Sequence, residues 1–372
     1  MRVTNKSNAI SLLFFSVFSV SFSLVSAAPN PLPSLDVGLT FKRPCMADPK
    51  GRSASNLVCC KWYEVLDDIQ LNLFEHECGP EAHESLRLTF HDAMGYSTTN
   101  PLMGGGADGS VMHFAEIEMG YVANHGVDEI VKLQRPFAIK HEVSFADFIQ
   151  FAGAVGLTHC PGSPRLQFFT GRSNQTIFPA PDGTLPLASD SVDKILERVN
   201  DVGFTADELV DLMASHSVAV QRHVDPSLPI NQSFLDSTPG TFDSQFYLET
   251  MLKGESFAGN GSHSEATSPF VGEFRLASDA ALARDPRTAC EWQSFVDNRT
   301  SMNQKFKLAM KKLSLVGHSL EHLVDCSEVI PIPVQPPSNS TTSLGNSASY
   351  PKGKGRSDVE VACDNGKGFP DL

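Results

Sequence analysis

Apolar positions along the chain recur mostly at three- and four-residue steps, the spacing of one face of an α-helix. The first such run comprises Leu57, Val58, Trp62, Val65, Leu66, Ile69 and Leu73. Residues 81–93 and 279–316 read the same way, and the alternation typical of strands is sparse. The pattern predicts a mostly helical protein with long loops.

Local signals mark where some of these helices and turns lie. Ser144 precedes a further apolar run, and Thr205 stands three residues before Glu208, which is the spacing of a capping box. The glycines at 104–106 and the segment 238–240 indicate ordered turns. Residues 331–357 are rich in Pro, Ser and Gly, so we expect no regular structure there.

The N-terminus has the layout of a secretory signal peptide. Arg2 and Lys6 precede a serine-broken apolar run that closes on small residues at 26–28. A membrane anchor is the alternative, but the serines and the cleavage-like end disfavour it. We therefore expect residues 1–28 to be removed and the protein to be secreted into the extracellular medium.

Composition excludes several classes of protein. Hydrophobic residues make up 41% of the 372 residues and charged residues 19%, which suits a globular core rather than a disordered chain. The net charge of −14 argues against nucleic acid or an anionic membrane as a partner. Beyond the signal peptide no run approaches the roughly 18 apolar residues of a membrane span, so no membrane association is expected.

The cysteines and glycosylation motifs fit a secreted protein. The chain has 8 Cys, which in an oxidising compartment predicts four disulfides. Zinc is the competing interpretation, but the chain has no C-x₂-C pair. The adjacent Cys59 and Cys60 cannot easily bond each other. Candidate glycosylation sites, each followed by the required Ser or Thr, are Asn174, Asn231, Asn260, Asn298 and Asn339.

The first candidate site lies on the helix predicted over residues 81–93. Arg87 and His91 are four residues apart and share a face, with Phe90 beside His91. A histidine can move a proton between the two oxygens of a peroxide, and an arginine can stabilise the charge that develops as the O–O bond breaks. An ordinary amphipathic helix is the alternative.

Two loops have the composition of calcium sites, since calcium needs six to eight oxygen ligands that include carbonyls. The candidate ligands of the first loop are Asp92, Gly106, Asp108 and Ser110. Those of the second are Ser217, Asp236, Thr238, Thr241 and Asp243. Hydrogen-bonded Asx turns without a metal are the alternative for either loop.

His216 lies near the end of a predicted apolar helix. A core histidine is the alternative, but an imidazole on a buried helix is also a usual ligand of haem iron. Such a ligand takes a carboxylate on its other nitrogen. Asp279 is a candidate for that carboxylate, although sequence spacing alone could not select it.

Together these blocks resemble the secreted fungal (class II) haem peroxidases, from about Cys45 to Cys363. The stretches that carry the resemblance are Glu84–Asp92, Gly104–Ser110, Asn124, His216–Ser217, Asp236–Phe246 and Ala289–Trp292. The resemblance implies an all-α haem peroxidase fold around one haem b, with two calcium ions and four disulfides. The catalytic domain would span 29–330, with a distal half at about 29–185 and a proximal half at 186–330. A C-terminal tail at 331–372 would be tied back by Cys363.

The resemblance also implies roles for single residues. His91 would be the distal acid–base and Arg87 the charge stabiliser. Asn124 would accept a hydrogen bond from His91, Glu118 would orient Asn124, and Phe90 would pack above the haem. His216 would bind the iron and Asp279 would hold its second nitrogen. The implied disulfides are Cys45–Cys60, Cys59–Cys326, Cys78–Cys160 and Cys290–Cys363.

The implied activity is the oxidation of donors by hydrogen peroxide in one-electron steps. The positions that hold manganese in relatives are Pro80, Glu84 and Arg222 here, and the exposed Trp of lignin-attacking members is replaced by Asp211. We therefore expect a generic peroxidase that oxidises small phenolic and aromatic donors at the haem edge, as a monomer. The alternatives are a manganese-dependent or lignin-type peroxidase with a non-standard site, and a non-catalytic, calcium-stabilised glycoprotein.

Overall fold

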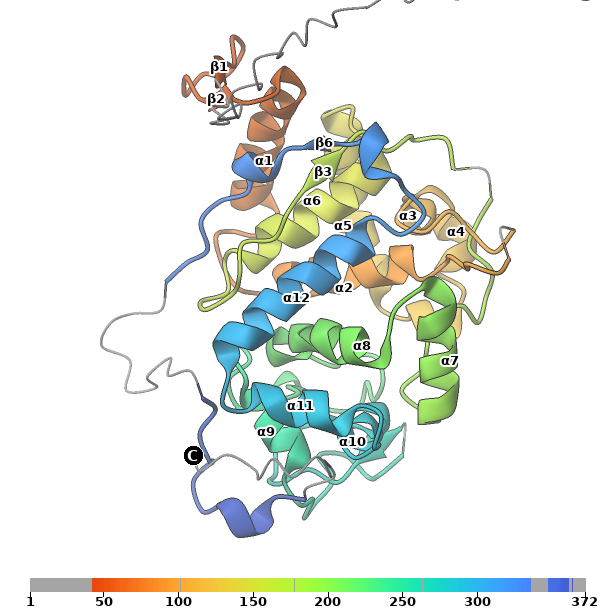
Figure 1. The fold of residues 1–372 in the computed structure, drawn as a ribbon, viewed down its shortest axis with the longest axis vertical. Helices are drawn as coiled ribbons and strands as arrows, with labels where there is room; N and C mark the ends of the chain where they lie inside the picture. The colour runs from red at the N-terminus through yellow and green to blue at the C-terminus, as the bar shows by residue number, and fades with distance from the viewer. Residues whose placement is uncertain are drawn as a thin grey trace, which may run out of the picture. The chain divides into compact units, whose positions relative to one another are not determined.

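The computed structural model describes residues 42–100, 102–176, 178–262, 264–335, 347–360 and 363, all within one compact unit (Figure 1). The signal peptide predicted at 1–28 and the sequon at Asn339 lie outside these ranges. The α-helices of the described residues are α1 (Cys60–Asn72), α2 (Pro80–Ala93), α3 (Ser110–His113), α4 (Ala115–Glu118), α5 (Val127–Lys140), α6 (Phe145–Leu157), α7 (Val192–Val202), α8 (Ala206–Leu212), α9 (Gln245–Met251), α10 (Ala277–Leu282), α11 (Ala289–Phe295) and α12 (Arg299–Ser314).

Short elements connect these helices. The 3₁₀ turns are η1 (Leu57–Cys59), η2 (Val122–Asn124), η3 (Met213–Val218), η4 (Ile230–Gln232), η5 (Leu320–His322), η6 (Ser327–Val329) and η7 (Arg356–Asp358). Three antiparallel two-residue pairs are β1 (Arg43–Pro44) with β2 (Ser53–Ala54), β3 (Phe169–Thr170) with β6 (Val324–Asp325), and β4 (Glu265–Ala266) with β5 (Arg275–Leu276). The prediction of a mostly helical protein with little sheet is confirmed.

α6 forms the centre of the distal half, and all of its residues are buried. It packs mainly against α2. Two glycines allow this close approach. A Cβ on Gly153 would lie 2.5 Å from Thr89, and one on Gly156 would lie 3.1 Å from the backbone of Ala82. The tight contact fixes the position of α2, which carries the first candidate site.

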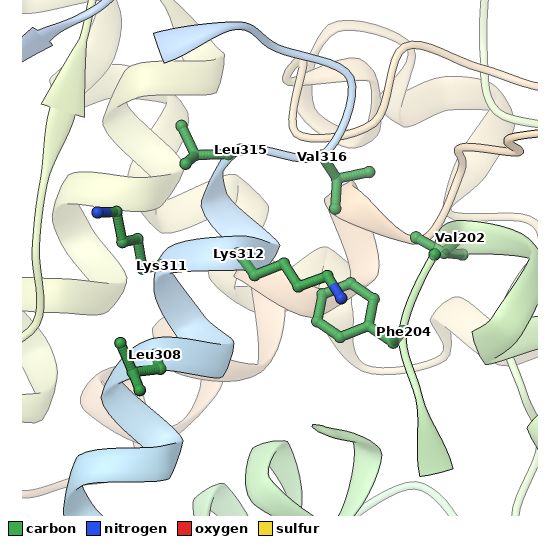
Figure 2. A pocket seen from close by; sticks show the side chains of 8 residues that line it. Val202, Phe204, Leu308, Lys311, Lys312, Leu315 and Val316 are labelled. Carbon is green, nitrogen blue, oxygen red and sulfur yellow. The ribbon is translucent and has the colours of Figure 1, made fainter. Parts of the chain in front are cut away.

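α12 joins the two halves, because it contacts both α2 and α8 (Figure 1). On α12, Lys312 extends over the ring of Phe204, 4.7 Å from its centroid, as Figure 2 shows. Its ammonium pairs with Glu208 of α8 at 2.6 Å. Glu208 also completes the capping box with Thr205 that the sequence predicts.

Two predicted helices differ from those observed. The apolar run 279–316 is divided among α10, α11 and α12. Pro286 lies between α10 and α11, because proline cannot continue a helix. Asn298 begins α12 as its N-cap, since its side chain accepts from the Ser301 amide at 3.0 Å. The helix expected to hold His216 ends at Leu212 and continues as the 3₁₀ turn η3.

Four disulfides fasten the chain, and they join the pairs that the resemblance implies. They are Cys45–Cys60, Cys59–Cys326, Cys78–Cys160 and Cys290–Cys363. The described part of the tail also pairs with the body, since the Ala348 amide donates to Val296 and the Glu360 amide donates to Met251. No helix of the described residues is long and apolar enough to span a membrane.

Candidate active site

The distal candidate site is built on one face of α2, which begins with Pro80 at its first turn. The Arg87 Nε donates to His91 Nε2 at 3.0 Å, and its Nη1 donates to Glu84 at 3.1 Å. The other ring nitrogen of His91, Nδ1, lies 2.8 Å from the Asn124 side-chain oxygen. Because an amide oxygen only accepts, this contact places the proton on Nδ1 and leaves Nε2 as a base.

The surroundings of His91 favour its neutral form. Burial, together with the nearby Arg87 guanidinium, lowers its pKa to about 3, although the hydrogen bond to Asn124 opposes this shift. A histidine held neutral in this way can accept a proton at Nε2 over a wide pH range.

Glu118 supports Asn124 by a route that the sequence does not specify. The Asn124 amide donates to the main-chain carbonyl of Glu118 at 2.9 Å, rather than to its carboxylate. The carboxylate accepts from the Ala180 amide at 3.0 Å. Burial raises the pKa of Glu118 to about 7. The side chain of Glu118 therefore fixes the backbone that holds Asn124.

The proximal candidate site lies on η3. The hydroxyls of Ser215 and Ser217 donate to carbonyls three residues earlier, at 2.9 Å each, which suits the tight 3₁₀ turn. His216 Nδ1 lies 3.0 Å from Asp279 Oδ2, although 63 residues separate them in the sequence. The ring of Phe246 packs edge-on against His216, with centroids 5.4 Å apart.

The two histidines are brought together because α2 contacts η3. Phe90, His91 and His216 retain partly exposed side chains, whereas their neighbours Asp92 and Ser217 are buried. The Asp279 carboxylate engages His216 Nδ1, which leaves Nε2 as the free donor atom. An imidazole supported by a carboxylate is a usual donor set for haem iron, so these residues fit a haem.

The distal loop gathers its acidic residues around an unsatisfied oxygen. Asp92 Oδ2 accepts from the Gly109 amide at 3.0 Å, whereas its buried Oδ1 has no partner among the described residues. Asp108 accepts from the Ser110 amide at 3.0 Å and donates its own amide to Gly106 at 2.8 Å. Burial raises the pKa of Asp92 well above its usual value, and the nearby Asp108 raises it further. A bound cation would satisfy this oxygen and offset the repulsion.

The proximal loop also contains a buried aspartate oxygen without a hydrogen-bond partner among the described residues. Asp236 Oδ1 accepts from the Thr238 amide at 2.8 Å, and its buried Oδ2 has no partner in the described part of the chain. The Thr238 hydroxyl donates to Asp243 at 3.1 Å, and the Thr241 amide donates to the Thr238 carbonyl at 2.9 Å. Burial raises the pKa of Asp243 to about 6. Ser217 follows His216 directly, and an isolated bridge between Val220 and Phe234 aligns its segment with the start of this loop.

Sequence reasoning missed one polar contact of the site. The Arg87 Nη2 donates to the main-chain carbonyl of His125 at 3.2 Å. A carbonyl carries no residue-type signal, so no sequence pattern could have found it. The candidate glycosylation sites at Asn174, Asn231, Asn260 and Asn298 are all exposed.

Comparison with known proteins identifies the family. The sequence model of the family described as peroxidase matches residues 64–298, and the model of the fungal peroxidase extension region matches residues 301–372. The chain is 51% identical to a versatile peroxidase of Pleurotus eryngii over 320 residues, which cover 84% of each chain. It is 48% identical to manganese peroxidase 3 of Phlebia radiata, over 94% of this chain and 93% of that one. It is 46% identical to ligninase H2 of Phanerodontia chrysosporium, over 93% and 90% of the two chains.

These relatives correct the sequence-based assignment to a generic type, which excluded the manganese, lignin and versatile types. A versatile peroxidase, a manganese peroxidase and a ligninase share 46–51% sequence identity with this chain over most of its length. The exclusion was wrong because it rested on Pro80, Glu84, Arg222 and Asp211 alone. These four positions do not outweigh the similarity of most of the chain to proteins of all three types.

Proposed function

The chain belongs to the fungal class II haem peroxidases, and from this membership we propose that it uses hydrogen peroxide to oxidise phenolic and aromatic donors by one-electron steps. The observation that carries the proposal is the pair of supported histidines. His91 has an unprotonated Nε2, which accepts from Arg87, and His216 has a carboxylate on Nδ1.

Each distal residue has a distinct role in the proposed reaction. His91 takes a proton from one oxygen of hydrogen peroxide at Nε2 and returns it to the other oxygen, which leaves as water. Asn124 keeps the His91 ring oriented and its Nδ1 protonated. Arg87 cannot lose its proton, so it stabilises the negative charge that develops on the leaving oxygen. Phe90 covers the site with an apolar ring.

On the proximal side, His216 would hold the haem through Nε2. The Asp279 carboxylate fixes the ring and raises its basicity as a ligand. When bound, the haem supplies the redox centre that receives the oxidising equivalents of peroxide. Phe246 packs against the edge of His216 and limits its rotation.

We propose one calcium ion for each loop. The distal ion would be held by Asp92, Gly106, Asp108 and Ser110. The proximal ion would be held by Ser217, Asp236, Thr238, Thr241 and Asp243. The unpartnered buried oxygens of Asp92 and Asp236 support this assignment, because a carboxylate oxygen buried without a partner is costly.

A second candidate concerns the donor. The relatives named manganese peroxidase and ligninase favour oxidation of Mn²⁺ or of lignin-type aromatics by the same centre.

The proposed function is tested by an absorption spectrum of the purified protein before and after one equivalent of peroxide. Steady-state assays with a simple phenol, veratryl alcohol and Mn²⁺ then test the donors. A Soret band that changes on peroxide addition supports the function, and the three rates rank the donors. A protein without haem absorption would refute it.

The proposal also covers the location of the protein outside the cell and the division of the chain into domains. We infer a secreted, extracellular, monomeric glycoprotein with a signal peptide at 1–28, a catalytic domain at 29–330 and a tail at 331–372. N-terminal sequencing of protein from the culture medium tests the cleavage near residue 28. Mass spectrometry before and after enzymatic deglycosylation tests the sequons, Asn339 included.

A further inference from the structure

A cavity of about 390 Å³ adjoins the distal site. It is lined by Met119, His125, Gly126, Asp128, His223 and Pro226. One wall is formed by residues between the end of α4 and the start of α5. The other is formed by His223 and Pro226, in the loop after η3. The first wall is connected to the distal residues, because the His125 carbonyl accepts from Arg87. The roles proposed above use no side chain that lines this cavity.

The polar groups of the cavity are available to a ligand to different degrees. The Asp128 carboxylate is already paired with Lys132 at 2.6 Å, and this pair, with a smaller contribution from His223, lowers the pKa of Asp128. The ring nitrogens of His125 and His223 make no hydrogen bond to any described residue. The imidazoles are therefore the groups that can meet a bound molecule, with Met119 and Pro226 as apolar surface.

Gly126 shows that the cavity depends on a close backbone contact. Its φ of +85° lies in the left-handed region. A Cβ at Gly126 would lie 1.9 Å from the His223 ring, so the ring rests directly on the glycine backbone. Any larger residue would displace His223 into the space. The position of the His223 ring therefore depends on the absence of a side chain at Gly126.

The groove in Figure 2 has the same volume but a different chemistry. It is lined mostly by apolar side chains of α12 and of the segment 202–204, and its Lys312 is already paired with Glu208. None of its lining side chains carries a hydrogen-bond acceptor. The cavity at His223 combines apolar surface with imidazole acceptors, which suits a small aromatic molecule that carries a hydroxyl.

We propose that this cavity is a binding site for phenolic donors, in which a ring nitrogen of His223 accepts the phenol hydroxyl. The inference rests on the proposed function. When the donor is oxidised, its O–H bond breaks, the proton passes to His223 and one electron leaves to the centre oxidised by peroxide. The product is a phenoxyl radical. Two phenols are consumed for each hydrogen peroxide, which is reduced to two waters.

The test measures equilibrium binding to the resting protein without peroxide. Binding of 4-methoxyphenol is compared with that of 1,4-dimethoxybenzene, which has no hydroxyl to donate, by NMR titration. We expect the wild type to bind the phenol about 3- to 10-fold more tightly than the ether, as one added hydrogen bond would give. His223→Phe should lose this preference, and His223→Gln, which keeps an acceptor, should retain part of it. His322→Phe, at an exposed position on η5, is the matched control.

Two results would overturn the inference. One is an unchanged phenol preference in a folded His223→Phe variant. The other is a titration in which Mn²⁺ shifts the His125 and His223 resonances while the phenol shifts neither, which would make the cavity a cation site. Failure of the proposed function is distinguishable, since it would appear as absent haem absorption and absent peroxide consumption with a non-phenolic donor.

Discussion

His91 on α2 and His216 on η3 each have Nδ1 held by another side chain, at 2.8 Å in the distal half and 3.0 Å in the proximal half. The distal partner is the neutral amide of Asn124, and the proximal partner is the carboxylate of Asp279. In addition, Arg87 places a positive charge against His91 alone. In the proposed function, the same side chain would act as a neutral proton acceptor in one half and as a metal ligand in the other. The difference between the two supporting residues is therefore the basis of the two roles that we propose.

Removal of the distal base should have the largest effect. His91→Leu takes away the group that moves the proton, so the rate of reaction with peroxide should fall by about 10²- to 10⁴-fold. Stopped-flow spectroscopy of the haem band measures this rate. His322→Leu serves as a control, and haem content should be unchanged in both variants. A rate close to wild type in His91→Leu would remove His91 from the mechanism.

Calcium removal should affect both halves, with different consequences. When the free calcium concentration is 100 times the dissociation constant, one bound ion stabilises the fold by about 2.7 kcal/mol. Chelation should therefore lower the melting temperature and the activity.

Asp92→Asn should act mainly on the reaction with peroxide, because Asp92 adjoins His91. Asp236→Asn should act mainly on haem retention. Full activity after calcium depletion, verified by metal analysis, would count against both loops.

Changing the proximal partner to match the distal one tests the comparison directly. Asp279→Asn replaces the carboxylate by an amide of the same shape, so His216 should become a weaker ligand. We expect a loss of about 10- to 100-fold in activity or haem affinity, together with a higher iron reduction potential. Spectroelectrochemistry measures the potential. Ser278→Ala removes only a 3.2 Å hydrogen bond to Asp279 and should show a smaller shift in the same direction. Unchanged potentials would mean that Asp279 does not tune the ligand.

Asp211 on α8, just before η3, should affect stability rather than the reaction. Burial, together with the nearby Glu291 carboxylate, raises its pKa to about 8, although Lys305 opposes the shift. An unfolded aspartate has a pKa near 3.9, so between about pH 4 and pH 8 the folded state holds a proton that the unfolded state releases. The contribution of Asp211 to stability should therefore be greatest below about pH 4 and fall as the pH rises towards 8, with a slope of at most about 1.4 kcal/mol per pH unit.

Asp211→Asn should flatten this part of the stability profile, as measured by urea unfolding at several pH values. Asp193→Asn, an exposed change on α7, is the control. The other charged groups near Asp211 are Glu291, Lys305 and Asp207. An equally steep profile in Asp211→Asn would assign the pH dependence to those groups.

The sequence by itself determined the helical class and the local chemistry. Arg87 and His91 are four residues apart on one helix, so their contact follows from helical geometry. Within the loops at 106–110 and 236–243, the hydrogen bonds of the Ser110 amide to Asp108 and of the Thr238 amide to Asp236 likewise join neighbouring residues. Helix periodicity was less reliable over 279–316, where Pro286 and the Asn298 cap divide one apolar run into three helices.

Only the tertiary structure decided which distant groups meet. Asp279 reaches His216 across 63 residues, and the His125 carbonyl reaches Arg87 across 38. The close contact of Gly126 with His223 likewise joins two distant segments. These contacts depend on how whole helices pack, and many pairings are compatible with the same local patterns. Local spacing therefore predicts contacts within one element, whereas contacts between elements are set by the packing of the complete core.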